Sequence, residues 1–139
     1  MDSKILVIKL VNGEDVFSAI EEAARKYNIR SGIILGGIGM LRDFELGYFE
    51  PGGYKTRVFD EPHELVSMTG SIAYSKTESD KFLPHIHCTL ADSNHKVFGG
   101  HLYKGTVNVI NEITILQLNN VILTRIKNET TGLMELNIE

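Results

Sequence analysis

Residues 85–102 read HIHCTLADSNHKVFGGHL, and this segment gives the most specific structural signal in the chain. Two β-like runs, 85–91 and 97–102, flank the polar stretch Asp92-Ser93-Asn94-His95. Two such runs around a short polar turn are typical of an antiparallel β-hairpin. The glycines at 99 and 100 indicate either a bulge or a close approach of another backbone just before His101.

Three of the five histidines can meet on this hairpin. His85 and His87 are two residues apart on one strand, so both side chains leave the same face. If the turn centres on Asn94, His87 pairs with His101 and His85 with Tyr103. Directly opposed Cβ atoms lie about 4.5–5.5 Å apart. The spacing therefore predicts three imidazoles on one patch, although a register slip of one residue would turn His101 to the other face.

Three neutral imidazoles are a ligand set for a divalent transition metal, and zinc is the default. They leave a fourth position open to water, substrate or another side chain. The simpler alternative is a polar sheet face with satisfied histidines. Cys88 points to the opposite face and is expected to be a small buried hydrophobe. His95 is expected in the solvated turn. His63 is expected at the surface, and it is the less favoured candidate for an additional metal ligand.

The rest of the chain predicts one α+β domain over residues 1–139. From Glu14 onward, apolar residues recur at three- and four-residue steps, which indicates an amphipathic helix. We expect a single, mostly antiparallel sheet curled around or against this main N-terminal helix. The expected strands beyond the hairpin are 4–11, 31–40 with 41–49 as its extended continuation, 54–59, 64–74, 106–110, 112–118 and 121–126. The tail 130–139 is expected to add an edge strand or fray.

Composition narrows the function classes. The formal net charge is -4, and the sequence has no cluster of lysines and arginines of the sort that binds DNA phosphates. No segment approaches the roughly 20 apolar residues of a membrane helix. The single cysteine cannot form an internal disulfide, which fits a reducing compartment. We therefore expect a cytoplasmic protein without a membrane partner.

Four motifs together resemble the PPC domain, the plants and prokaryotes conserved domain. They are GGIG at 36–39, ELVSMTGSI at 64–72, PHIHCTLAD at 84–92 and GGHL at 99–102. The resemblance extends from the first strand to about Gln117. It implies a compact α+β fold, a homotrimer, and a metal, usually zinc, on the histidines that match His85, His87 and His101.

The same resemblance raises DNA binding, because plant members join this domain to AT-hook motifs. This sequence has no Arg-Gly-Arg core flanked by prolines and basic residues. The minor-groove contact made by that element is therefore absent. DNA remains a partner suggested by the family but not supported by the charge.

Three functions remain open. The first is a metal-binding homotrimeric module of unknown ultimate role. The second is a metal-dependent hydrolase or lyase acting on a small molecule, in which the metal lowers the pKa of bound water to about 7. For that enzyme Glu64 is the candidate general acid or base and Tyr103 an assistant, although both also fit structural roles. The third is a DNA-associated protein that acts through a partner or through an unusual surface patch.

Overall fold

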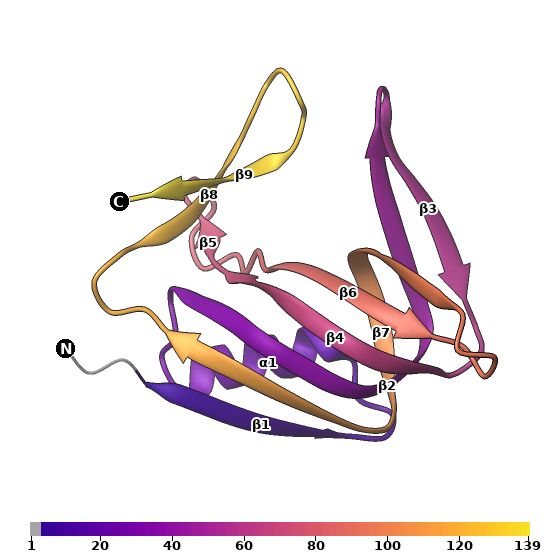
Figure 1. Cartoon of the computed structure of the whole chain (residues 1–139). Helices are drawn as coiled ribbons and strands as arrows, with labels where there is room; N and C mark the ends of the chain where they lie inside the picture. The colour runs from indigo at the N-terminus through magenta and orange to yellow at the C-terminus, as the bar shows by residue number, and fades with distance from the viewer. Residues whose placement is uncertain (1–3) are drawn as a thin grey trace.

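The computed structural model describes residues 4–139 and confirms a mostly-β member of the α+β class (Figure 1). Within the described residues there is one helix, and it lies near the N-terminus as predicted. The elements in chain order are β1 (Ile5–Val11), α1 (Val16–Lys26), β2 (Gly32–Glu50), β3 (Gly53–Phe59), β4 (His63–Ile72), β5 (Tyr74–Ser75), β6 (His85–Ala91), β7 (Val97–Gln117), β8 (Leu123–Lys127) and β9 (Met134–Ile138).

The main sheet is antiparallel and curls back on itself. Its strand order is β1-β7-β6-β4-β2-β3, and β7 also pairs with β2. The strands β7, β6, β4 and β2 thus form a closed ring of pairings, which confirms the predicted curled sheet. A second, three-stranded sheet has the order β5-β8-β9 and includes the C-terminal tail as its edge strand.

The helix covers one side of this sheet. Asp15 caps it by accepting a hydrogen bond from the backbone N–H of Ser18 at 2.8 Å. One stripe of α1 is fully buried and carries Val16, Ile20 and Ala24. These side chains belong to the same core as Leu10 of β1 and as buried residues of β2, β4, β6 and β7. Burial of this stripe holds α1 on the sheet.

The side of the main sheet that faces away from α1 is called the outer face. The strand register shows which residues lie on it. A row of paired residues crosses five strands, from Ile5 to Leu116, Ile33, Ser71 and His85. Directly paired residues share a face, so His85 lies on the same side of the sheet as Ile5. The outer face therefore carries both the histidines and the apolar side chains of β1.

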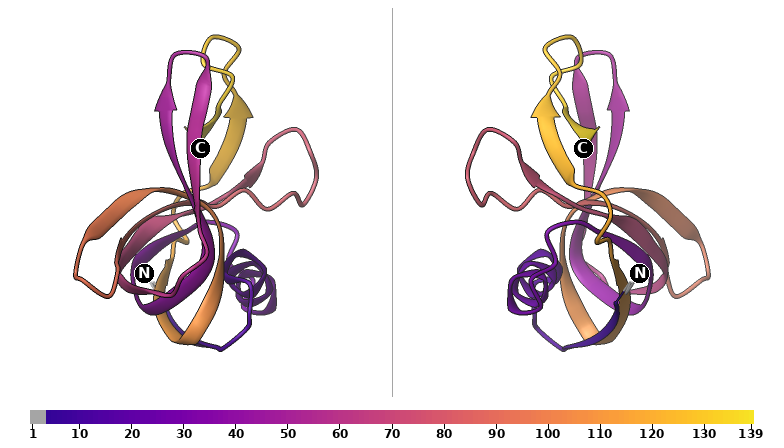
Figure 2. Two further views of the ribbon diagram at one scale, coloured as in Figure 1. Left: turned by 90° about the vertical axis from the view of Figure 1, so that its right-hand side faces the viewer. Right: turned by 90° about the vertical axis from the view of Figure 1, so that its left-hand side faces the viewer.

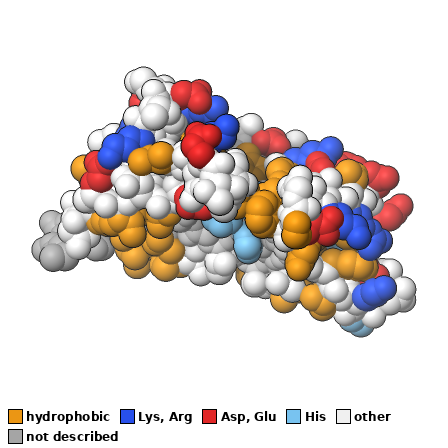
Figure 3. Space-filling model, turned by 90° about the horizontal axis from the view of Figure 1, so that it is seen from above, with side chains coloured by type: hydrophobic (Ala, Val, Ile, Leu, Met, Phe, Trp, Pro, Cys, Tyr) orange, Lys and Arg blue, Asp and Glu red, His pale blue; other side chains and the backbone are white. Residues whose placement is uncertain are grey.

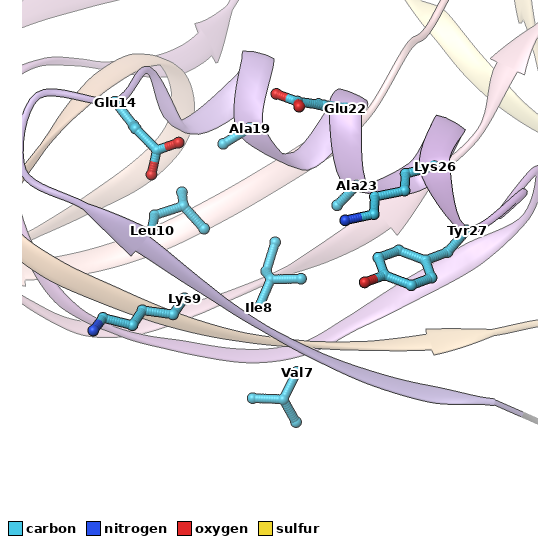
Figure 4. Close-up of a pocket in the computed structure, with 10 residues that line it drawn as sticks. All are labelled: Val7, Ile8, Lys9, Leu10, Glu14, Ala19, Glu22, Ala23, Lys26 and Tyr27. Carbon is cyan, nitrogen blue, oxygen red and sulfur yellow. The ribbon is translucent and has the colours of Figure 1, made fainter.

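The close-up of the groove between β1 and α1 illustrates these two sides (Figure 4). Ile8 and Leu10 point toward the helix, and Val7 points away from it. The groove has a volume of about 320 Å³. Its one carboxylate on the connecting loop, that of Glu14, already accepts the backbone N–H of Val11. The groove offers no cluster of metal ligands.

Strand β7 is much longer than the sequence predicts. The segments 31–40 and 41–49 are one strand, β2, and three predicted segments between 97 and 118 are joined in β7. Register shifts interrupt the pairing of β2 with β7 at Ile34/Gly36, Gly39/Met40 and near Glu45. Such bulges bend a strand and break its alternating pattern without ending it. The separate strands predicted between 97 and 118 were therefore wrong, and the bulges are the reason, whereas 41–49 continues 31–40 as expected.

Two ribbons rise from the same side of the main sheet (Figures 1 and 2). One is formed by the end of β2 with β3, and the other is the β8–β9 hairpin. The side chains between them form the cavity described below. In the described part of the chain, no helix is long and apolar enough to cross a membrane.

Gly39→Ala tests the tight crossing of β2 and β7. Gly39 has a φ of 139°, and an added Cβ would lie 2.0 Å from the carbonyl oxygen of Ile110. We expect the variant to lose about 1–3 kcal/mol of unfolding free energy in urea denaturation. Gly36→Ala is the matched control, because its Cβ would meet nothing within 4 Å. Equal stability of the two variants would contradict the crossing.

Candidate metal centre

The structure brings the three predicted histidines together. His87 pairs directly with His101, as the hairpin register predicts, and His85 lies opposite Ser71 of β4. The Nε2 atoms of His85 and His87 are 3.0 Å apart. One ring nitrogen from each of the three residues lies within 4.8 Å of the others. The three imidazoles thus converge on one point of the outer face.

These nitrogens fit a metal ion. Zn–N bonds of about 2.0–2.1 Å in a tetrahedral site place ligand nitrogens roughly 3.3 Å apart. The observed spacing approaches this value, so small side-chain rotations complete it. The Nδ1 atom of His101 is buried and has no hydrogen-bond partner among the described residues. A buried polar atom without a partner is costly, and coordination would satisfy it.

Burial favours the neutral forms of His85 and His101. Burial lowers the pKa of His101 to about 4, and the nearby His85, His87 and Arg125 add to this effect. Burial also lowers the pKa of His85, with contributions from His87 and Arg125. At pH 7 both rings therefore offer a free lone pair, which is the form that binds a metal.

Aromatic rings pack beside the histidines. The rings of Tyr54 and Tyr103 lie 5.1 and 4.8 Å from that of His101, measured between centroids. The predicted pairing of His85 with Tyr103 is not formed, because β7 leaves β6 after His101 and pairs with Gly47 and Leu46 of β2. Tyr103 nevertheless lies beside the centre, in contact with His101 and Tyr54.

A cavity of about 590 Å³ opens next to the cluster. Figure 3 looks onto this side of the molecule, where histidine side chains are visible near the middle with apolar side chains on both sides. The β8–β9 hairpin supplies one wall, and Tyr54 with Tyr103 supplies another. The lining residues are Tyr54, Leu83, Pro84, His85, His101, Tyr103, Arg125, Leu133, Met134, Glu135 and Leu136.

Sequence reasoning missed Arg125. This residue is 5% exposed and lines the cavity beside His85 and His101. The signal was present, since Arg125 is a single cation inside the otherwise apolar alternation of 121–126. A charged residue at an inward position of a strand is rare unless it has a role there.

The remaining candidates lie elsewhere. Glu64 is exposed and pairs with Ala91, four residues along β6 from His87, or roughly 13 Å at 3.3 Å per residue. Its assignment as general acid or base stays a prediction, and its position gives no direct contact with the cluster. His95 is exposed in the hairpin turn, as predicted. Cys88 is buried away from the histidines, and burial raises the pKa of its thiol to about 12.

The surface position predicted for His63 is wrong. This side chain is 6% exposed, and its Nδ1 lies 2.8 Å from the carbonyl oxygen of Glu61. Its ring packs edge-on against Phe44 and Phe59. His63 starts β4 in a small aromatic cluster and is no ligand of this centre.

The chain belongs to the Plants and Prokaryotes Conserved domain family, whose model matches residues 2–119. The resemblance drawn from the four motifs is thereby confirmed. The match includes the three histidines and ends before β8 and β9.

Solved structures agree with this assignment. The chain is similar to a plant- and prokaryote-conserved protein from Pyrococcus horikoshii, with 27% identity, a TM-score of 0.83, and coverage of 95% of this chain and 91% of that one. It is also similar to a protein from Archaeoglobus fulgidus that is described as metal-containing, with 30% identity, a TM-score of 0.83 and the same two coverages. A third neighbour, from Ralstonia eutropha, carries a provisional DNA-binding description and has 25% identity, a TM-score of 0.81, and coverage of 94% and 89%.

Curated relatives extend the comparison to a larger protein. The chain is 26% identical over 137 residues to a protein named Bifunctional protein GlmU from a Synechococcus strain. The matched region covers 98% of this chain and 20% of that protein. The chain thus spans about a fifth of the length of the curated relatives it matches, so a domain like this one also occurs within a longer chain.

Proposed function

We propose that this protein binds one divalent transition metal, zinc by default, on His85, His87 and His101, with the fourth position open. The observation that carries the proposal is the convergence of one imidazole nitrogen from each of His85, His87 and His101 to within 4.8 Å of one another. The metal-containing description of the Archaeoglobus fulgidus neighbour supports it. A metal on three histidines polarises a bound water or substrate oxygen.

Elemental analysis of untagged protein purified without chelator tests this centre. We expect about one zinc per chain in the parent protein and little in His101→Ala, because two imidazoles alone make a weak site. His95→Asn is the matched control, since it removes an exposed histidine and asparagine tolerates the positive φ of 64° at that position. A full equivalent of metal in His101→Ala would refute the three-histidine assignment.

We further propose that the protein is a homotrimer assembled through the apolar part of the outer face. The family resemblance implies the trimer, and the surface of the chain supports an interface. Ile5, Val7 and Ile38 are 65%, 68% and 53% exposed, although all three are apolar. Large apolar side chains gathered on one exposed face of a protein often mark an interface.

Light scattering coupled to gel filtration tests the assembly. We expect a trimer for the parent protein and a smaller species for Val7→Lys, because a lysine on the outer face would bury an unpaired charge in the interface. Ser18→Lys adds the same charge on the exposed side of α1 and should leave the trimer intact. If Val7→Lys had the same mass in solution as the parent, β1 would not be part of the interface.

A metal-dependent hydrolase or lyase is the second candidate function. The specific observation that favours it is the cavity beside the histidines, which is large enough for a small molecule and carries the rings of Tyr54 and Tyr103. Within it these two phenols are placed to orient a ligand. Hydrolysis of simple esters by the parent protein, with loss in His87→Ala, would establish the enzyme, and no turnover would leave a binding module.

We do not propose direct DNA binding for this chain. The net charge of -4 gives no general attraction to phosphates. The provisional description of the Ralstonia eutropha neighbour does not alter that charge. We place the protein in the cytoplasm, because its one cysteine, Cys88, is free and buried and needs no oxidising compartment.

A further inference from the structure

Arg125 is a buried cation without a carboxylate partner. Its guanidinium donates from Nη2 to Ser71 Oγ at 2.7 Å, from Nε to the carbonyl oxygen of Leu83 at 3.2 Å, and from Nη1 to that of Met134 at 3.5 Å. All three acceptors are neutral. The ion pairs among the described residues involve other arginines and lysines, and none includes Arg125.

A buried charge needs compensation. The guanidinium has five N–H donors in a fixed fork, and only three hydrogen bonds are made here. Removing a cation from water without an opposite charge costs several kcal/mol. The bond to Ser71 ties β8 to β4 of the main sheet, the bond to Leu83 ties it to the loop before β6, and the bond to Met134 lies within the β8–β9 hairpin. None of the three neutralises the charge.

Arg125 lines the cavity beside the histidines, and an anion bound in that cavity would supply the missing countercharge. The carboxylate of Glu135 also borders this cavity, but it accepts from Asn128 Nδ2 and Thr131 Oγ1, both at 3.0 Å, within its own hairpin. His85 and His101 lie on the wall of the same cavity. A ligand bound there would contact the guanidinium and the open side of the histidine cluster together.

We propose that this cavity binds a small organic ligand through an oxyanion group, a carboxylate or a phosphate, held by Arg125 beside the three histidines. The planar fork of arginine matches both groups in a bidentate way. The apolar walls, which include Leu83, Pro84 and Leu136, suit a short hydrocarbon body attached to the anion. This inference rests on the proposed metal centre and specifies what its open position faces.

Arg125 lies outside the segment that defines the family. The family model ends at residue 119, and Arg125 is on β8 beyond it. The histidines therefore belong to the shared domain, whereas the cation beside them comes from the C-terminal hairpin of this chain. The hairpin thus contributes ligand selectivity to the site.

Titration calorimetry with butyrate, butyramide and inorganic phosphate tests the proposal on zinc-loaded and zinc-free protein. Butyramide has nearly the shape of butyrate but no charge. We expect the zinc-loaded parent to bind butyrate or phosphate, and to bind butyramide roughly thirtyfold more weakly or not at all. Tighter binding of phosphate than butyrate would assign the pocket to phosphoryl ligands, and the reverse to carboxylates.

Variants of Arg125 test whether this side chain binds the anion. Arg125→Met should weaken anion binding by roughly thirtyfold or more while keeping its zinc, and Arg125→Lys should retain part of the affinity. Arg30→Met is the matched control, because Arg30 is exposed and paired with Asp80, and it should bind as the parent does. If Arg125→Met folds poorly, the comparison of butyrate with butyramide on the parent protein still tests whether the cavity requires an anion.

The outcomes separate the two proposals. Equal binding of butyrate and butyramide, or no binding of either anion, would overturn the oxyanion site even if zinc is present. Anion binding that depends on Arg125, in a parent protein that neither contains zinc after purification nor takes it up, would support the oxyanion site and refute the metal centre. Loss of zinc from Arg125→Met would make Arg125 a structural support of the histidines and overturn its role in the ligand site.

Discussion

The pairing of His87 with His101 across β6 and β7 is the constraint on which the rest of the structure depends. Strand β6 lies between β7 and β4, and its separate register with β4 places Ser71 opposite His85 and Thr69 opposite His87. The inner residues Ile86 and Leu90 are fully buried and hold the register. A slip of one residue would expose them and turn the histidines into the core, so hydrophobic burial protects the site geometry.

The charge of the site depends on how deeply its histidines and Arg125 are buried and on their common position at one cavity. Burial lowers the pKa values of His85 and His101 and favours their neutral forms. Burial also lowers the pKa of the Arg125 guanidinium beside them. A divalent metal and a guanidinium together would give the base of this cavity a strongly positive potential in a chain whose net charge is -4. That contrast between a local positive site and an acidic protein favours small anions over a polyanion such as DNA.

The outer face combines two properties that are usually separate. The row of paired residues that begins at Ile5 ends at His85, so the apolar surface of β1 and the histidine cluster share one side of the sheet. Assembly through this side would bring a second copy toward the cavity. Long strands with bulges make this possible, because β2 and β7 bend enough to close the sheet and still carry a ribbon above it.

The sequence by itself determined the class of fold, the single helix, the hairpin and its register, and hence the meeting of His85, His87 and His101. These features follow from periodicity and from pairings between neighbours in the chain, which are local. Only the tertiary structure decided that Arg125 joins the site, that His63 is buried, and that the three strand segments between 97 and 118 form the single strand β7. Those outcomes depend on contacts between residues far apart in the chain and on bulges that interrupt the local pattern, and no short segment of sequence encodes them.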